Sequence, residues 1–396
     1  MAIRIDRLAA TLLLSLVSLL PASSRAADQP VTLHAILPLS GPGAFLGTQE
    51  QAAMQIGEKL VNAQSGIRGR PVRFVFHDDQ SKPQVAVQLL QQILPQKPSI
   101  VLGSATVANC NAMMPIMADG PVMYCLSPTI QPAPGSYIFT SNVSTEDANR
   151  AIIRYFRMRG LTRIGLVTAT DAMGQNAEKS IEEALRLPEN AGMTLVGKTE
   201  FNPTDINITA QLIRLKAAAP DVLLAWNTGA PIGTVFKGLV DTGFEIPVAT
   251  NYGNMTYAQM NAYAGFLPKE LYFPSAEWVP HPENLNLSPE VEAAQKDFFA
   301  QFAAANVKPD VAHTMVWDPM MIVVSALRET GPDAGPAAIR DALMRFKNYA
   351  GVNGAYDFTK IPQRGLSDEN VVVSRWDATR GAWEVVSRPT GIPIER

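Results

Sequence analysis

Charged residues and cysteines are both scarce in this chain. Only 17% of its 396 residues are charged, the formal net charge is −3, and there are two cysteines and four histidines. Without an excess of lysine and arginine, the chain lacks the basic face that nucleic-acid binding requires. No Cys-x-x-Cys and no close group of histidines and cysteines occurs, so the sequence predicts neither a metal site nor a cofactor.

Long apolar runs are also lacking, with one exception near the start. The run 8–20 follows two arginines, is short for a membrane span, and precedes a stretch of small residues. This pattern predicts a secretory signal peptide over residues 1–27, cleaved after Ala26 or Ala27. We therefore expect an exported, periplasmic protein that is soluble once processed.

The two cysteines, Cys110 and Cys125, leave two interpretations open. In an oxidising compartment such a pair can form a disulfide. Alternatively, both are separate buried thiols, since cysteine packs as a small apolar residue.

Strand and helix patterns alternate along almost the whole mature chain, which predicts an α/β protein with parallel sheets flanked by helices. The pattern runs to about residue 142 and then begins again, so two Rossmann-like lobes are expected. No flexible linker separates them, which favours a hinge of several crossings. The predicted lobes are 28–142 plus 276–354 and 143–275 plus 355–396, and the expected crossings lie near 140–144, 274–277 and 351–355.

One stretch combines a strand, a turn and a helix start. Residues 100–102 are a short apolar strand, Gly103–Thr106 a turn, and a helix follows. Free N–H groups near Thr106 to Asn109 could hold an anion without a cationic side chain. Any strand–turn–helix unit makes such a turn, however, so this stretch alone does not define a site.

Several motifs resemble the branched-chain amino acid type of periplasmic solute-binding protein. They are Leu37-Pro-Leu-Ser-Gly-Pro42 with Gly47, the segment Asn62–Arg70 with Phe76-His-Asp-Asp79, and the segment 238–244. The resemblance implies a two-lobed type I periplasmic-binding fold, here a monomer, that closes on a small ligand. It also implies delivery of that ligand to an ABC permease in the inner membrane.

The resemblance places a ligand carboxylate at two turns of the first lobe. In the family it is held after the third and fourth strands, mainly by backbone N–H groups. The corresponding positions here are Val107, Ala108, Asn109, Ser127, Thr129 and Gln131.

The half of the site that would hold an ammonium group differs from the family pattern. Tyr252 stands where an acidic residue is usual, while Leu46, Met173 and Thr228 stand where tyrosines are usual. A buried ammonium without a carboxylate would cost about 3–5 kcal/mol. We therefore expect that the ligand is not an amino acid.

The side chains at these positions suggest an aromatic acid instead. Phe45, Leu46, Met173, Trp226 and Tyr252 would form aromatic and polarizable walls for a ring. The hypothesis is a carboxylate similar to benzoate, phenylacetate, phenylglyoxylate or cinnamate. A Trp at a strand end or a Met near a helix start more often belongs to a lobe core than to a ligand wall. A branched-chain or other neutral amino acid, or an amide, is the alternative ligand.

Other classes of function have weaker support. A hydrolase would need a nucleophile elbow, but no Gly-x-Ser-x-Gly occurs and Ser104 lacks the second glycine. Asp78 and Asp79 are adjacent on a predicted strand and point to opposite faces, so they cannot readily share a substrate. A sensory receptor would need a membrane segment or a signalling domain, and none is recognisable. We therefore expect a binding protein, not an enzyme.

Overall fold

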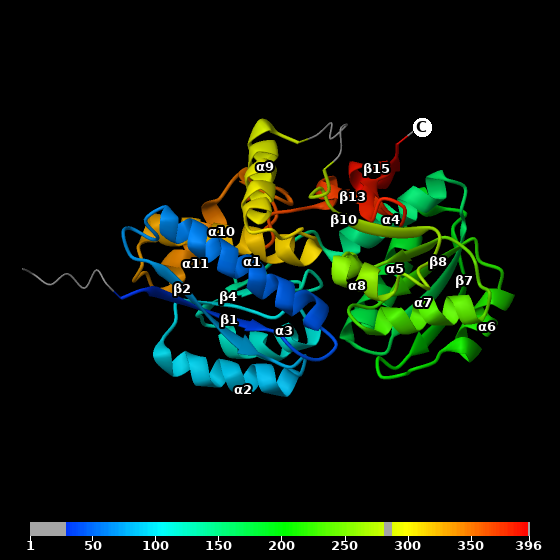
Figure 1. Cartoon of the computed structure of the whole chain (residues 1–396), viewed down its shortest axis with the longest axis horizontal. Coiled ribbons are helices and arrows are strands. Elements are labelled where there is room, and N and C mark those ends of the chain that lie inside the picture. Colours follow the sequence, from blue (N-terminus) through cyan, green and yellow to red (C-terminus); the bar gives the residue numbers. More distant parts are fainter. Residues whose placement is uncertain (1–28, 281–286, 395–396) are drawn as a thin grey trace, which may run out of the picture.

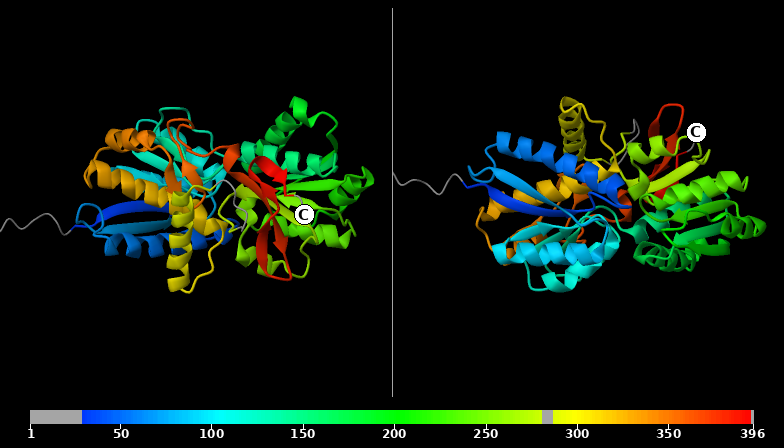
Figure 2. Two further views of the ribbon diagram at one scale, coloured as in Figure 1. Left: turned by 90° about the horizontal axis from the view of Figure 1, so that it is seen from above. Right: turned by 60° about the horizontal axis from the view of Figure 1, so that its bottom comes forward.

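The computed structural model describes residues 29–280 and 287–394 as two α/β lobes that lie side by side (Figure 1). The predicted signal peptide lies outside the described residues. Both further views keep the blue, cyan and orange segments in one lobe and the green segments in the other (Figure 2). Within the described residues, no helix combines the length and apolar character that a membrane span requires.

The first lobe is built on a parallel five-stranded sheet with the order β2-β1-β3-β4-β5. Its strands are β1 (Val31–Leu37), β2 (Val72–Asp78), β3 (Ile100–Leu102), β4 (Val122–Cys125) and β5 (Ile138–Thr140). On one face lie α1 (Ala44–Ala63), α10 (Val311–Thr330) and α11 (Pro336–Arg345); on the other lie α2 (Pro83–Ile93) and α3 (Val107–Met113). Alternate residues of β1 enter the two cores, with Leu33, Ala35 and Leu37 facing α1 and Ile36 facing α2.

The second lobe contains a seven-stranded sheet with the order β14-β13-β10-β9-β8-β6-β7. Its strands are β6 (Arg163–Ala169), β7 (Thr194–Phe201), β8 (Val222–Trp226), β9 (Val248–Thr250), β10 (Leu271–Ala276), β13 (Val371–Asp377) and β14 (Ala382–Val385). One face packs against α4 (Thr145–Met158) and α5 (Ala172–Leu185), the other against α6 (Thr209–Ala217), α7 (Pro231–Asp241) and α8 (Tyr257–Ala262).

This second sheet is mixed, which corrects the prediction of a purely parallel one. β13 runs antiparallel to β10, and β14 antiparallel to β13. No helix separates β13 from β14; a short turn joins them, and such a turn can only connect antiparallel strands.

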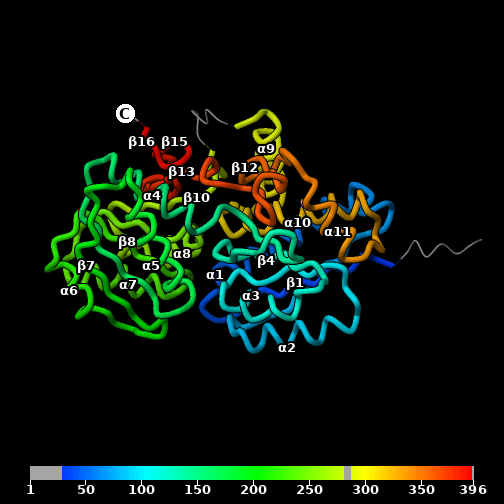
Figure 3. The backbone as a smooth tube through the Cα atoms, turned by 180° about the vertical axis from the view of Figure 1, so that it is seen from behind, coloured from blue at the N-terminus to red at the C-terminus, as the bar shows by residue number. Residues whose placement is uncertain are grey.

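The chain passes between the two lobes three times, and the first and third connections can be followed from behind in Figure 3. The three connections join β5 to α4, β10 to α9 (Pro289–Ala304), and β12 (Gly354–Tyr356) to β13. The hairpin of β11 (Tyr349–Gly351) and β12 precedes the third connection, and β15 (Ser387–Arg388) and β16 (Ile392–Pro393) follow β14.

The turn of that hairpin is anchored to the first lobe by one buried carboxylate. Asp318 of α10 accepts hydrogen bonds from the amides of Val352 (2.7 Å) and Asn353 (2.9 Å) and from the Tyr356 hydroxyl (2.9 Å). The third connection therefore starts from a fixed point on α10.

Candidate ligand-binding cleft

A pocket of about 220 Å³ lies between the lobes, at the carboxyl ends of the parallel strands of both sheets. This is where open α/β sheets bind ligands. It is lined by Pro42, Gly43, Leu46, Ser81, Ala105, Thr106, Val107, Ala108, Asn109, Asp171, Ala172, Met173, Pro203, Thr228 and Pro231. The volume is below the usual range for drug-sized ligands, so it suits a small molecule.

The first-lobe wall contains the start of α3. The Ser104 hydroxyl accepts a hydrogen bond from the Thr106 amide (3.2 Å) and so shapes the turn that leads into the helix. Asn109 is fully buried; its side chain lies close enough to Asp79 to favour the charged form of that carboxyl, and it makes no other hydrogen bond among the described residues.

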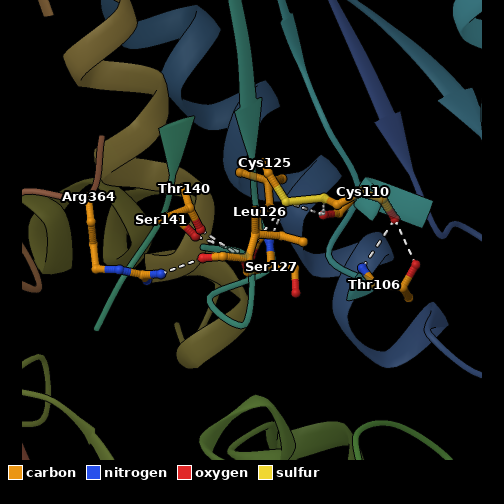
Figure 4. The surroundings of a disulfide bond; sticks show 10 residues. Thr106, Cys110, Cys125, Leu126, Ser127, Thr140, Ser141 and Arg364 are labelled. Carbon is orange, nitrogen blue, oxygen red and sulfur yellow. Dashed lines mark hydrogen bonds between the residues drawn. A yellow bond between two sulfur atoms is a disulfide. The ribbon is translucent and has the colours of Figure 1, made fainter. Parts of the chain in front are cut away.

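A disulfide between Cys110 and Cys125 joins the two first-lobe turns predicted to hold the ligand (Figure 4). Cys110 lies in α3 and Cys125 ends β4, and both are completely buried. The amide of Ser127 donates to Cys125 Sγ (3.3 Å), and the Thr140 hydroxyl donates to the Ser127 carbonyl (2.8 Å). The turn after β4 is thus fixed to α3 on one side and to β5 on the other.

The two lobes touch across the cleft. The Thr129 hydroxyl of the first lobe lies 3.5 Å from Met173 Sδ of the second. The amide of Ala230, just before α7, donates to the carbonyl of Pro42, just before α1 (3.2 Å). Side-chain and backbone contacts of this kind define a closed arrangement of the lobes.

Four side chains at or next to the cleft contain buried polar atoms whose hydrogen-bonding capacity is not filled by close partners among the described residues. They are the side-chain amides of Asn109 and Asn227 and the hydroxyls of Ser127 and Thr228. Asn109 and Thr228 line the pocket itself; other buried atoms of this kind lie elsewhere in the fold. Buried polar groups are normally hydrogen-bonded, so such atoms in a pocket wall are available to a polar ligand or ordered water.

Two carboxyl groups lie close behind the first-lobe wall. Burial raises the pKa of Glu50 well above its usual range, and the nearby Asp79 raises it further. Burial also raises the pKa of Asp79, although hydrogen bonding from the side chains of Ser104 and Asn109 and from the amide of Ser81 (2.8 Å) favours its charged form. A protonated Glu50 adds no second negative charge beside Asp79 behind this wall.

The structure brings six of the twelve predicted site residues into the pocket lining. They are Leu46, Val107, Ala108, Asn109, Met173 and Thr228. Thr129 contacts Met173 of the lining, and Ser127 lies in the same turn, two residues after the disulfide-bonded Cys125. Exposed Gln131 donates a hydrogen bond to Glu146 of α4.

The three predicted aromatic walls are placed elsewhere in this closed arrangement. Phe45 packs edge-on against Tyr263 across the cleft, with ring centroids 6.2 Å apart. Trp226 is fully buried in the core that α4 and α5 share with their sheet, because alternate β8 side chains point to that face. Tyr252 is fully buried as well, and its hydroxyl donates to the carbonyl of Val143 (2.7 Å). Burial raises its pKa, so this hydroxyl stays protonated.

Sequence reasoning missed Asp171, the one charged side chain in the lining, as far as the described residues go. Asp171 is the N-cap of α5, and its carboxylate accepts a hydrogen bond from the amide of Gly174 (2.9 Å). An Asp three residues before a glycine at a helix start was a signal available in the sequence. No lysine, arginine or histidine of the described part lines this pocket.

Metal binding has no structural support in the described residues, which contain no group of three or more histidine, cysteine, aspartate or glutamate side chains suited to holding an ion. The site is therefore built from backbone amides, small polar side chains and apolar walls. Two α/β lobes that close on such a pocket define a solute-binding protein of the periplasmic type.

The chain belongs to the periplasmic binding protein family, whose family model matches residues 30–381. It is 20% identical over 357 residues to Leu/Ile/Val-binding protein homolog 3 of Brucella melitensis, covering 89% of this chain and 93% of that protein.

Two solved structures show the same type I periplasmic-binding fold. A solute-binding protein of an R. palustris ABC transporter, in complex with benzoate, is 20% identical with a TM-score of 0.75, covering 93% of this chain and 98% of that one. The branched-chain amino acid transporter substrate-binding protein LivJ from Streptococcus pneumoniae, in complex with isoleucine, is 20% identical with a TM-score of 0.74, covering 90% and 99%.

Proposed function

We propose that this protein is the extracytoplasmic solute-binding component of an ABC importer and that it binds a small carboxylate, an aromatic acid, between its lobes. The observation that carries this proposal is a small interlobe pocket of about 220 Å³ whose wall contains the start of α3 and the buried polar atoms of Asn109 and Thr228, beside the Ser127 hydroxyl, which is unpartnered among the described residues. Most of these groups can donate hydrogen bonds, as an acceptor-only carboxylate requires.

The apolar part of the pocket lining favours a ligand with an aromatic ring over a ligand with a polar chain. Leu46, Val107, Met173 and Pro231 offer aliphatic and thioether surface on both sides of the pocket. Such groups pack favourably on the faces and edges of an aromatic ring. In this proposal the carboxylate meets Asn109 and the Ser127 turn, and the ring points toward Met173. Trp226 and Tyr252 then support the wall from behind rather than stacking on the ring.

A neutral amino acid is the second candidate, and Asp171 favours it. A carboxylate at the second-lobe end of the pocket could pair with the ammonium group of a zwitterion, the role that Tyr252 cannot fill. The Asp171 carboxylate would also repel a ligand that carries only a negative charge. Because Asp171 is exposed, solvent weakens this repulsion.

The variant Asp171→Asn separates these two ligands, because asparagine caps a helix as well as aspartate and removes only the charge. Affinities for benzoate, phenylacetate and leucine would be measured by calorimetry. The proposal predicts that an aromatic acid binds the unaltered protein and binds the variant equally or more tightly. Leucine binding that weakens about tenfold in the variant, with no binding of aromatic acids, would replace the first candidate by the second.

The transport role carries further expectations. The ligand-loaded, closed protein would dock on an inner-membrane permease, and the protein alone would be a monomer without catalytic activity. Light scattering checks the oligomeric state. Intact mass of protein recovered from the periplasm checks cleavage after Ala26 or Ala27, and ligand uptake in a strain lacking this chain checks transport.

A further inference from the structure

Arg364 is a buried cation in the third connection between the lobes. It follows β12, and only 4% of its surface is exposed. Its guanidinium donates to the carbonyl of Ile130 (2.6 Å) and to that of Asn142 (3.1 Å). Ile130 lies in the turn from Ser127 to Gln131, and Asn142 lies in the first connection. Figure 4 draws the Arg364 side chain reaching toward this turn from one side, with the disulfide on the other.

Both hydrogen bonds of this guanidinium go to carbonyl groups rather than to a carboxylate. Within the described residues, no acidic side chain lies within 4.0 Å of it, although Glu146 and Asp147 at the start of α4 are near enough to favour its charge. These two acids have partners of their own. Asp147 binds Ser144 and Arg150 (2.7 Å each), and Glu146 accepts from Gln131 and Asn176.

The tyrosines that face Arg364 are neutral and do not balance its charge. They are Tyr252 and Tyr124, and burial raises the pKa of both phenols. A buried cation whose hydrogen bonds go only to carbonyls is stabilised by anions within its field, here the two acids at the start of α4, and a ligand carboxylate in the cleft would add to them. The Ser127 hydroxyl, unpartnered among the described residues, belongs to the turn that Arg364 binds from behind.

We propose that Arg364 is a specificity-determining residue, which makes the cleft prefer an anionic ligand to its neutral isostere. Arg364 acts through the turn from Ser127 to Gln131 and does not touch the ligand. The proposal rests on the proposed function, namely that a small carboxylate occupies the cleft. Because the charge is buried, salt screens it poorly, so the preference persists at high ionic strength.

The test compares benzoate with benzamide, which has a similar shape and no charge. Calorimetry gives the ratio of the two affinities in the unaltered protein, in Arg364→Gln and in Arg364→Lys. Glutamine keeps an amide that can donate to the carbonyls but loses the charge. Lysine keeps the charge but loses the planar guanidinium that donates to both carbonyls at once. We expect the acid-to-amide ratio to fall about tenfold in Arg364→Gln and by less than about threefold in Arg364→Lys.

The opposite outcomes are distinct. If Arg364→Gln weakens benzoate and benzamide by the same factor, Arg364 is only structural and the inference fails while the proposed function stands. If the unaltered protein binds no aromatic carboxylate, the proposed ligand fails, and this inference with it. If Arg364→Gln does not fold, the salt dependence of the acid-to-amide affinity ratio in the unaltered protein is the test. Loss of the preference for the acid between about 20 mM and about 500 mM NaCl would overturn a buried source of selectivity.

Discussion

The backbone carbonyl of Pro42 in the first lobe accepts a hydrogen bond from the amide of Ala230 in the second (3.2 Å). The residue before Ala230 is Gly229, which adopts φ +87°, and a Cβ atom placed there would lie 2.4 Å from the Pro42 oxygen. The lobes can therefore approach this closely only because residue 229 has no side chain.

Gly229→Ala should weaken ligand binding by about tenfold, because it disfavours the closed arrangement by more than about 1 kcal/mol. Gly192→Ala is the matched control: Gly192 has a similar φ of +96° but open space around it. Both variants carry the same kind of backbone strain, so calorimetry with the cognate ligand isolates the contact between the lobes. Equal affinities in the two variants would show that the Pro42 contact does not govern closure.

Replacing Cys110 and Cys125 together by alanine should lower the free energy of unfolding by about 3 kcal/mol, the expected value for a loop of this length. The two cysteines are 15 positions apart in the sequence. Ligand affinity should fall as well, since the bond joins α3 to the turn after β4. Denaturant titration measures the first effect and calorimetry the second. An unchanged affinity in a destabilised variant would place the ligand away from these two segments.

Tyr252→Phe should cost about 1 kcal/mol of stability, because it removes the buried hydrogen bond to the Val143 carbonyl and leaves that carbonyl without a donor. Tyr263→Phe is the control, since the Tyr263 hydroxyl makes a longer, more exposed bond to the Ala230 carbonyl (3.3 Å). Chemical denaturation of both variants gives the comparison. A loss in Tyr252→Phe no larger than in Tyr263→Phe would contradict a structural role for the Tyr252 hydroxyl.

Glu277, just after β10, should make stability fall as pH rises toward neutrality. Burial raises its pKa from 4.5 to about 7, so the folded state holds this proton more tightly than the unfolded state does. The resulting stabilisation is complete below pH 4.5 and is lost as pH rises through about 7, a change of about 3 kcal/mol.

The variant Glu277→Gln should therefore show a flatter dependence of unfolding free energy on pH between about 5 and about 8. Denaturant titrations at several pH values test this. Glu245→Gln is the control, because its ion pair with Lys269 lowers the Glu245 pKa and leaves that carboxyl charged throughout this range. A slope that persists in Glu277→Gln would assign the pH dependence to another group.

The alternation of strands and helices could be predicted from the sequence because each parallel strand is a short apolar run followed by an amphipathic helix. The mixed character of the second sheet could not. Strands β13 and β14 are apolar runs like the others. Their direction is set by tertiary packing, which decides the neighbour that β13 pairs with. Strand β5 was missed because Ile138–Thr140 is too short to show a period.

At the site, backbone-defined features were easier to predict than side-chain directions. The start of α3 lies in the pocket wall, as its strand–turn–helix pattern suggested. Trp226 and Tyr252 also stand at strand ends, but whether such a ring points to the cleft or to the core depends on one residue of register and on a single hydrogen-bond partner. Asp171 belongs to the loop after β6, which the strand end places at the cleft, but nothing in the sequence shows that its capping carboxylate also lines the pocket.

The order of the strands has a consequence for how the molecule is made. The first lobe needs α10 and α11 from late in the chain, and the second-lobe sheet is completed by β13 between β14 and β10. Neither lobe is a contiguous piece of sequence, so no single excised fragment will contain one intact. During synthesis the core of each lobe cannot be completed until residues about 200 or more positions after its first strand have been made.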